Sequence, residues 1–163
     1  MVWRYGELEK MWPAALANIK ALAEGSAKVT ITLKTEINAL ADKVWQYWTT
    51  PEHIMQWNQA SDDWHCPQAT NDLRPGGSFS YTMAAKDGSF SFEFKGSIDD
   101  LKQKEYVKAT LGDGRLWKTY FQPDEKTTIV TEQFEAENTH SLEMQRIGWQ
   151  AILTNFKKYT ETN

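Results

Sequence analysis

The sequence is poor in cysteine, has no long apolar segment and shows no excess of basic residues. Its single cysteine cannot form a disulfide within the chain, which predicts a reducing compartment. Without a run of about 18 apolar residues, no helix is expected to span a membrane, and the N-terminus lacks a secretory signal. A net charge of −4 argues against nucleic acid as a partner. These absences predict a cytoplasmic protein that binds neither membranes nor nucleic acids.

The residue patterns of metal, phosphate and nucleophilic sites are missing as well. His53 and His140 are far from His65 in the sequence, and no second cysteine is present to act as a metal ligand. Glycines 76–77 lack the Lys-Ser/Thr pair that completes a phosphate-binding loop. Cys66 follows His65, but neighbours on a strand point to opposite faces, which favours a buried, inert thiol over a nucleophile. We therefore predict no metal, no cofactor and no catalytic residue.

Aromatic residues are what the sequence has in plenty. The chain of 163 residues contains eight Trp, seven Phe and six Tyr, and 40% of its residues are hydrophobic. This composition is sufficient for one folded domain with a single core. It leaves open whether the aromatic side chains fill that core or line a cavity within it.

The N-terminal part of the chain carries helical and strand patterns in turn. Apolar residues recur at helical spacing over residues 6–24. Residues 28–36 alternate strictly between apolar and polar, which predicts a half-buried strand. Asn38 is the expected N-cap of a helix over residues 38–48. A second short helix is expected over residues 50–57, because Pro occupies its first helical position.

From about residue 65 to residue 135 the pattern is that of short strands separated by turns. Apolar and polar residues alternate, and turn residues such as Gly and Asp recur every few positions. The clearest strands cover residues 78–83, 90–95, 105–111, 115–122 and 127–135, with turns at 86–88, 112–114 and 123–125. Such close spacing predicts an antiparallel meander. A long helix from about residue 141 to residue 159 ends the chain and carries an apolar stripe that suits it to cover the sheet.

Acidic residues occur in pairs, but at positions where exposure to solvent is expected. Asp62, Asp63, Asp99 and Asp100 fall in predicted loops, and Glu93 lies on the polar side of its strand. Acid–base catalysis needs carboxylates placed together in a pocket. These residues therefore do not indicate a catalytic site.

Residues 12–24 repeat the pattern of residues 149–161. Six of the thirteen positions are identical at an offset of 137 residues. One explanation is chance similarity between two amphipathic helices, since Ala, Leu, Lys and Glu all favour helices. The other is descent of the first helix from the closing helix of a preceding copy of the domain. Under both explanations we expect residues 1–25 to form a helical extension and residues 26–163 to form the folded domain.

The aromatic residues of the strands and of the closing helix are candidates for the walls of a ligand cavity. If the sheet curves toward the helix, the space between them has apolar walls and a few polar groups, which is the usual form of a small-molecule site. A solid core is the alternative for each of them. The candidate wall residues are Trp57, Trp64, Phe79, Tyr81, Phe92, Phe94, Trp117, Tyr120, Trp149, Leu153 and Phe156. The candidate polar groups are His65 and Arg115.

Residues 44–96 carry a series of short motifs in a characteristic order. They are TPEHI, ASDDWHCP, NDLR, a Gly-Gly pair and AKDGS, and the later segments TLGDGR, VTEQFEAE and QRIGWQAILTNFKKY extend the series. On these motifs the sequence resembles bacterial homologues of the C-terminal domain of the activator of the 90-kDa heat-shock protein ATPase. Those proteins belong to the START-like, Bet v 1-like superfamily. The resemblance covers roughly residues 28–160 and leaves out residues 1–25.

This resemblance implies an α+β helix-grip fold. A curved antiparallel sheet of about six to seven strands would wrap around the long C-terminal helix, with two short helices after the first strand. The N-terminal helix is extra to that pattern. The resemblance also implies that a small hydrophobic molecule binds between sheet and helix; a few members of the superfamily are cyclases or hydrolases, and we assign no catalysis to this chain. We expect the chain to be a monomer or a homodimer.

Two other functions are kept as alternatives. The first is an interaction protein that acts on a chaperone, with the Trp-rich stretch 57–64 as its exposed surface, because aromatic residues are enriched at binding hot spots. The second is an enzyme of the cyclase or hydrolase kind, which requires a polar group with a shifted pKa inside the pocket. His65, Glu93 and Arg115 are the residues to test for that activity.

Overall fold

The computed structural model describes residues 29–163, so the helix expected at residues 6–24 lies outside the described residues. The described chain contains seven strands and three helices. In chain order they are β1 (Thr30–Ile37), α3 (Ala41–Thr49), α4 (Pro51–Trp57), β2 (Trp64–Asn71), β3 (Ser78–Ala85), β4 (Ser91–Lys102), β5 (Tyr106–Leu111), β6 (Leu116–Asp124), β7 (Thr127–Glu135) and α5 (Leu142–Thr162).

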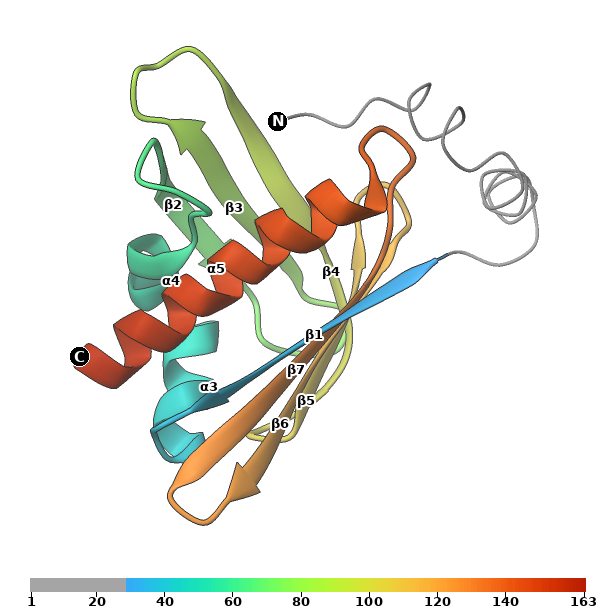
Figure 1. The fold of residues 1–163 in the computed structure, drawn as a ribbon. Coiled ribbons are helices and arrows are strands. Elements are labelled where there is room, and N and C mark those ends of the chain that lie inside the picture. Colours follow the sequence, from blue (N-terminus) through green and yellow to red (C-terminus); the bar gives the residue numbers. More distant parts are fainter. Residues whose placement is uncertain (1–28) are drawn as a thin grey trace.

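The strands form one antiparallel sheet in the order β1-β7-β6-β5-β4-β3-β2. Strands β2 to β7 are the predicted meander, because each pairs with the next along the chain, whereas β1 closes the far edge beside β7. Figure 1 shows that the sheet is strongly curved between these two edges. The ladder between β4 and β5 shifts register between Ile98 and Asp100, an irregularity of the kind that increases local bend and twist.

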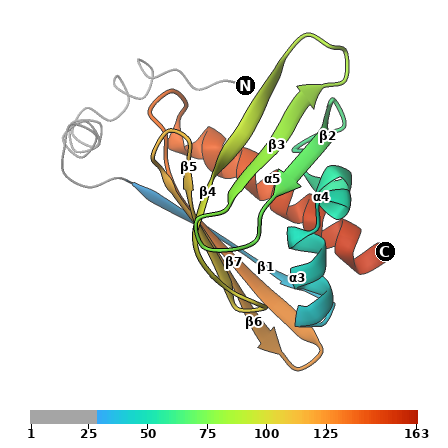
Figure 2. The ribbon, with the colours of Figure 1, turned by 180° about the vertical axis from the view of Figure 1, so that it is seen from behind.

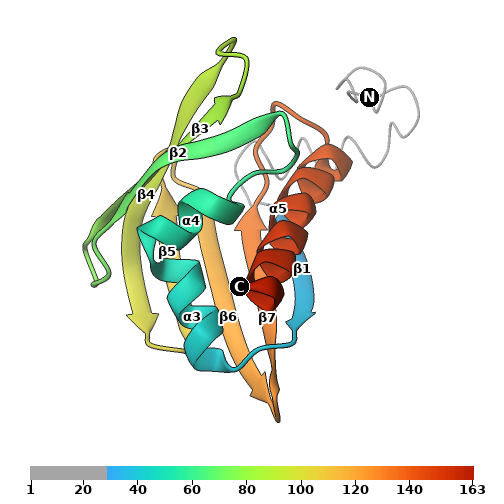
Figure 3. The same ribbon diagram turned by 90° about the vertical axis from the view of Figure 1, so that its left-hand side faces the viewer.

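The long helix α5 lies in the hollow of this sheet. Seen from the side, α3, α4 and α5 all occupy the concave side (Figure 3), and from behind α5 passes behind β3 and β4 (Figure 2). Leu153 and Phe156 of α5 are fully buried in the same core as Val130 and Phe134 of β7. The helix-grip fold that the sequence predicted is confirmed, including the two short helices after the first strand.

The connection between β1 and α3 differs from the prediction. Asn38 is not the N-cap of α3; Leu40 occupies that position, and no side chain caps the helix. The backbone N–H of Asn38 instead donates a hydrogen bond to Oε2 of Glu161, 2.8 Å away. Asn38 therefore joins the end of β1 to the end of α5, a contact across the whole chain that local sequence does not reveal.

Strand β4 continues through Asp99 and Asp100, which were expected in a loop. The Thr110 hydroxyl donates to Oδ2 of Asp99 at 2.6 Å, and the Tyr106 hydroxyl donates to Oδ2 of Asp100 at 3.0 Å. Both donors belong to the neighbouring strand β5. These cross-strand bonds offset the low strand propensity of aspartate, so the acidic pair remains exposed but lies within the sheet.

Strand β6 also runs further than predicted, through Pro123 to Asp124, and the chain turns only at residues 125–126. The ladder between β6 and β5 ends at Tyr120. Pro123 therefore faces no partner strand on that side, and its missing N–H costs no ladder hydrogen bond. The tight turn that follows places Glu125 in the left-handed region, at a φ of 59°.

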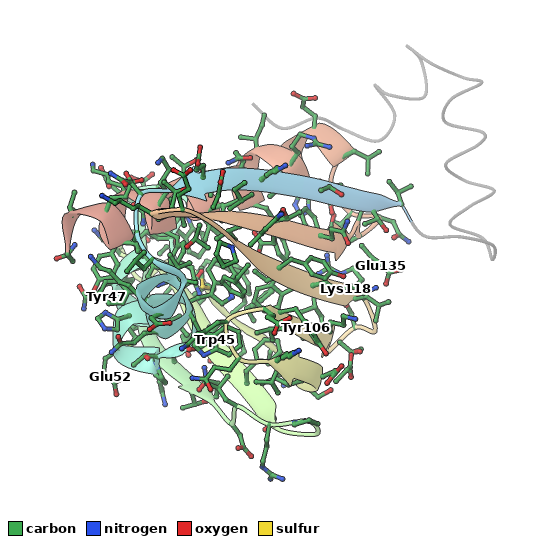
Figure 4. The ribbon with its side chains drawn as sticks, turned by 90° about the horizontal axis from the view of Figure 1, so that it is seen from below. Trp45, Tyr47, Glu52, Tyr106, Lys118 and Glu135 are labelled. Atoms are coloured by element: carbon green, nitrogen blue, oxygen red, sulfur yellow. The ribbon has the colours of Figure 1, made fainter. Side chains whose placement is uncertain are left out.

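The two short helices close one end of the molecule. Figure 4 places Tyr47 of α3 and Glu52 of α4 at that end, and Lys118 and Glu135 of the sheet at the other. Tyr47 stacks on His53 with ring centroids 3.9 Å apart.

Candidate functional site

A cavity of about 320 Å³ lies between α5 and the concave face of the sheet. Seven aromatic side chains from α3, α4, α5 and the strands form most of its wall. They are Trp48, Trp57, Tyr81, Phe92, Phe94, Trp117 and Trp149. A smaller number of polar side chains also face it, namely Asn58, Arg115, Glu132, Glu137, His140 and Gln145. The remaining wall is Met83, Met144, Gly148 and Ile152.

Seven of the residues singled out from the sequence line this cavity. They are Trp57, Tyr81, Phe92, Phe94, Trp117 and Trp149 among the aromatic candidates and Arg115 among the polar ones. The strand residues reach the cavity because Tyr81, Phe94 and Trp117 lie on the face of the sheet that turns toward α5. Phe94, Trp117 and Trp149 pack edge-on against one another, with ring centroids between 5.3 and 5.9 Å apart.

Other candidates are core residues that do not reach the cavity. Leu153 and Phe156 are fully buried, and Phe156 packs edge-on beneath Trp48 and Trp57 with ring centroids 4.9 and 4.8 Å apart. Phe79 borders a separate space of only about 20 Å³ between the sheet and α3. These three therefore support the cavity wall from behind rather than line it.

Tyr120 lies on the other face of the sheet. Along β6, Thr119 and Phe121 are buried on the concave side, so the alternation of side chains turns Tyr120 outward. Trp117 and Tyr120 are three residues apart, a spacing that places two strand residues on opposite faces. The prediction that both line the cavity was therefore wrong for Tyr120.

The Trp-rich stretch 57–64 is not the exposed aromatic surface that was predicted. Trp57 is only 4% exposed, stacks on Trp48 with ring centroids 5.0 Å apart, and donates its indole N–H to the Tyr47 carbonyl oxygen. Trp64 is half-buried and packs edge-on against Phe90, outside the cavity. The stretch contributes one wall residue, Trp57, and no continuous aromatic patch.

Neither His65 nor Cys66 lines the cavity. Cys66 is 2% exposed. Burial raises the pKa of its thiol to about 11, although hydrogen bonds with Gln68 and Asn58 act in the opposite direction. A thiol of this kind is protonated at neutral pH and is a poor nucleophile, in agreement with the buried, inert thiol expected from the sequence.

The most unusual polar group of the cavity is Glu132. It lies on β7 between Val130 and Phe134, facing α5, and is only 4% exposed. Its Oε2 accepts a hydrogen bond of 2.7 Å from the indole N–H of Trp117. Burial raises the pKa of this carboxyl group to about 7, and the Trp117 hydrogen bond opposes that shift. Glu132 therefore titrates close to neutral pH inside an apolar wall.

The two basic side chains that line the cavity both face other carboxylates. Nε of Arg115 donates to Oδ2 of Asp113 at 2.8 Å, and its Nη1 donates to the Glu135 carbonyl oxygen at 3.3 Å. Nδ1 of His140 lies 3.1 Å from Oε2 of Glu137. Within residues 29–163, Trp117 is the one hydrogen-bond partner of the Glu132 carboxyl group, which has no basic partner.

The loop between β7 and α5 is held at the edge of the cavity by Gln145. Its Nε2 donates to the carbonyl oxygens of Glu137 and His140 at 3.0 and 2.9 Å, and its Oε1 accepts from the Glu137 N–H. Because Gln145 is itself buried, these bonds fix the loop backbone against the first turns of α5. These hydrogen bonds therefore hold the loop at the edge of the cavity in a defined conformation.

The sequence carries a signal for Glu132, although this residue was not among the predicted site residues. Val130, Glu132 and Phe134 share the same parity on β7, and the first and last of them are apolar. A carboxylate at the central position of an apolar strand face is uncommon and predicts a buried acidic group. The remaining wall residues that were not predicted, such as Gly148 and Gln145, carry no comparable signal.

Other kinds of site were also sought within the described residues. No group of three or more His, Cys, Asp and Glu side chains there is placed to hold a metal ion. None of the helices over residues 29–163 has the length and apolar character needed to cross a bilayer.

Comparisons with known proteins agree with this architecture. The model of the family described as Activator of Hsp90 ATPase homolog 1-like protein matches residues 38–161. A search of curated proteins found no match.

Two solved structures are similar in both sequence and fold. The AHSA1-like protein of Aeromonas hydrophila is 38% identical over 82% of this chain and 93% of its own, with a TM-score of 0.78. Chr148 of Cytophaga hutchinsonii is 49% identical over 82% of this chain and 93% of its own, with a TM-score of 0.72. CV1439 of Chromobacterium violaceum, at 18% identity and a TM-score of 0.74 over 83% of this chain and 99% of its own, shares the fold.

The family match extends over most of the chain, and its helix-grip fold commonly holds hydrophobic ligands. The curved sheet, the enclosed α5 and the cavity between them are the features expected of such a fold. The chain therefore belongs to the Activator of Hsp90 ATPase homolog 1-like family.

Proposed function

We propose that this protein binds a small hydrophobic molecule in the cavity between α5 and the sheet. The observation that carries the proposal is the open volume of about 320 Å³ behind seven aromatic side chains. A filled core leaves few voids larger than a water molecule, whereas this volume lies in the range of small-molecule sites. The apolar wall with a few polar groups on one side supports a ligand with a large apolar body.

Gly148 offers a way to test the cavity without disturbing the core. It lines the cavity from α5, and a Cβ atom added there meets no atom within 4 Å. A glycine inside a helix costs about 1 kcal/mol relative to alanine. Gly148→Ala should therefore keep or raise stability, while Gly148→Phe extends a ring into the open space.

The experiment is a fluorescence titration with N-phenyl-1-naphthylamine, a neutral apolar dye whose emission rises in apolar surroundings. The wild-type protein and Gly148→Ala are expected to bind the dye saturably at one site. Gly148→Phe is expected to lose at least about tenfold in affinity, equivalent to about 1.4 kcal/mol, because its ring occupies the dye's volume. Thermal unfolding of all three proteins checks that each is folded.

Absence of saturable binding to the wild-type protein would contradict the proposal, and so would equal binding by Gly148→Phe. Native mass spectrometry of the protein as purified adds an independent measurement. A bound mass of a few hundred daltons would support the proposal and begin the identification of the natural ligand.

The two alternative functions have less support. Interaction with a chaperone stays a prediction, which is tested by the ATPase rate of the bacterial chaperone with and without this protein. The surface expected for that interaction included Trp57, which is buried in the core. For an enzyme, the three residues named for testing are not gathered in one place. Arg115 lines the cavity, whereas His65 does not and Glu93 is exposed on the outer face.

A further inference from the structure

We propose that the ligand of this cavity is an apolar amine whose ammonium group pairs with the carboxylate of Glu132. This inference rests on the proposed function and adds to it the chemical class of the ligand. It is carried by the position of Glu132 in the wall, by the partners of the other charged groups and by the aromatic rings around it.

The first observation is that the Glu132 carboxylate lacks a charge partner. A buried ionised carboxylate is costly unless a cation and hydrogen bonds compensate it. Its Oε2 receives one hydrogen bond, from the indole of Trp117. Its Oε1 has no hydrogen-bond partner within residues 29–163, and the Glu132 residue lines the cavity.

The second observation is that the basic side chains that line the cavity already lie against carboxylates other than Glu132. Arg115 pairs with Asp113, and His140 lies against Glu137. No lysine is among the residues that line the cavity. The described part of the chain therefore provides no positive charge to compensate the Glu132 carboxylate, and we infer that the ligand supplies it.

The third observation is the set of aromatic rings beside this carboxylate. Trp117, which donates to Glu132, packs edge-on against Phe94 and Trp149, with ring centroids 5.3 and 5.9 Å away. Aromatic faces attract ammonium groups, most strongly when both are removed from water. Neither of the cation–π contacts of the described side chains lies at the cavity, since both involve lysines on Tyr47 and Tyr106.

A carboxylate beside aromatic rings favours an ammonium group over other polar groups. A neutral hydroxyl would donate one hydrogen bond to the Glu132 carboxylate, whereas an ammonium group donates a hydrogen bond and adds the attraction between opposite charges, which is strong where water is excluded. A carboxylate on the ligand would be repelled by Glu132. The other wall residues are mainly aromatic and aliphatic, so the body of the amine is apolar.

The test is a calorimetric titration with three probes that share a naphthalene body. They are 2-naphthylmethylamine, which is cationic, 2-naphthalenemethanol, which is neutral, and 2-naphthoate, which is anionic. At about pH 8, where most of the Glu132 carboxyl groups and most of the amine carry charge, the amine is expected to bind about tenfold more tightly than the alcohol. The anion is expected to bind most weakly.

Two variants assign this preference to its residue. Glu132→Gln keeps the size and an acceptor for Trp117 but removes the charge, so it is expected to bind the amine and the alcohol equally. Glu93→Gln makes the same change on the outer face, where Glu93 accepts hydrogen bonds from Ser80 and Thr82, and should keep the preference. Circular dichroism verifies that both variants are folded. If Glu132→Gln does not fold, the order in which the wild-type protein binds the three probes still decides the proposal.

The outcomes separate this inference from the proposed function. If the wild-type protein binds all three probes equally, or the anion best, the amine proposal is overturned while a hydrophobic site remains. Retention of the amine preference in folded Glu132→Gln overturns it as well. Failure of all three probes, together with failure of the neutral dye, overturns both.

Discussion

Glu132 combines a carboxyl group, an apolar strand face and one indole donor. Burial raises the pKa of this carboxyl group from 4.5 to about 7. Between these two pH values the folded protein keeps the proton, whereas the unfolded chain has released it. Such a group stabilises the folded state below the unfolded pKa, and its contribution is lost as the pH rises through the folded pKa. The residue therefore makes the protein less stable in alkaline than in mildly acidic solution.

We predict that Glu132→Gln stabilises the ligand-free protein at pH 8. The pKa of Glu132 is about 7 in the folded state and 4.5 in the unfolded state. This difference lowers the free energy of unfolding of the wild type by about 3 kcal/mol between acidic and alkaline pH. Glutamine does not titrate, so the free energy of unfolding of the variant should exceed that of the wild type by up to about 3 kcal/mol at pH 8. The difference should shrink as the pH falls toward 5. Urea unfolding at both values, followed by tryptophan fluorescence, measures it.

The control for this prediction is Glu93→Gln. Glu93 is exposed and its pKa is lowered, mainly by the hydroxyls of Ser80 and Thr82, so that variant should not gain stability at high pH. A stability difference between Glu132→Gln and the wild type that is the same at pH 5 and pH 8 would show that Glu132 does not titrate as described.

At the scale of the elements, local sequence decides where helices and strands begin. The start of α5 is an example, because Ser141 occupies the N-cap position and its hydroxyl accepts a hydrogen bond of 3.1 Å from the Met144 N–H. The apolar stripe over the following turns predicted the rest of the helix. The end of the helix, at Thr162, lies beyond the expected residue 159, since helix termini carry weaker signals than helix interiors.

We predict that Ser141→Ala lowers the free energy of unfolding by about 1 kcal/mol, because the cap bond to Met144 is lost. Thermal and urea unfolding measure the change. Thr162→Ala, at the exposed opposite end of the helix, is the matched control and should change stability by less than about 0.5 kcal/mol. An equal effect of the two substitutions would mean that the Ser141 cap contributes nothing specific.

Strand positions were predictable, but the partners of each strand end were not. The alternation of Phe79, Tyr81 and Met83 placed their strand and its buried face correctly. Asp99 looked like a loop residue because its stabilising partner, Thr110, belongs to the next strand. Likewise, Pro123 looked like a turn residue. A proline is tolerated in the strand there because the ladder between β5 and β6 ends before it, which the local sequence does not show.

At the scale of the whole molecule, the described residues form a seven-stranded sheet that curves around one helix. Strand β1, the first described element, pairs along its full length with β7, and α5 packs between them and the short helices. The family match also begins only at residue 38. The fold of residues 29–163 thus has a continuous core of its own.

We predict that a chain lacking residues 1–25 still folds and unfolds in a single cooperative transition. The expected result is a urea transition whose slope differs little from that of the full chain, since the slope reflects the surface buried in the core. Loss of cooperative unfolding in the shortened chain would show that residues 1–25 are part of the folded domain.

The sequence by itself determined the fold class, the order of the elements and the identity of most aromatic wall residues, because strand alternation, helix periodicity and turn residues are local properties. Only the tertiary structure decided that a cavity remains open, that Trp57 is in the core and that Tyr120 faces outward. It also decided that Glu132 meets Trp117 while Arg115 pairs elsewhere. These features depend on the curvature and register of seven strands around one helix, which set the distances between residues far apart in the chain.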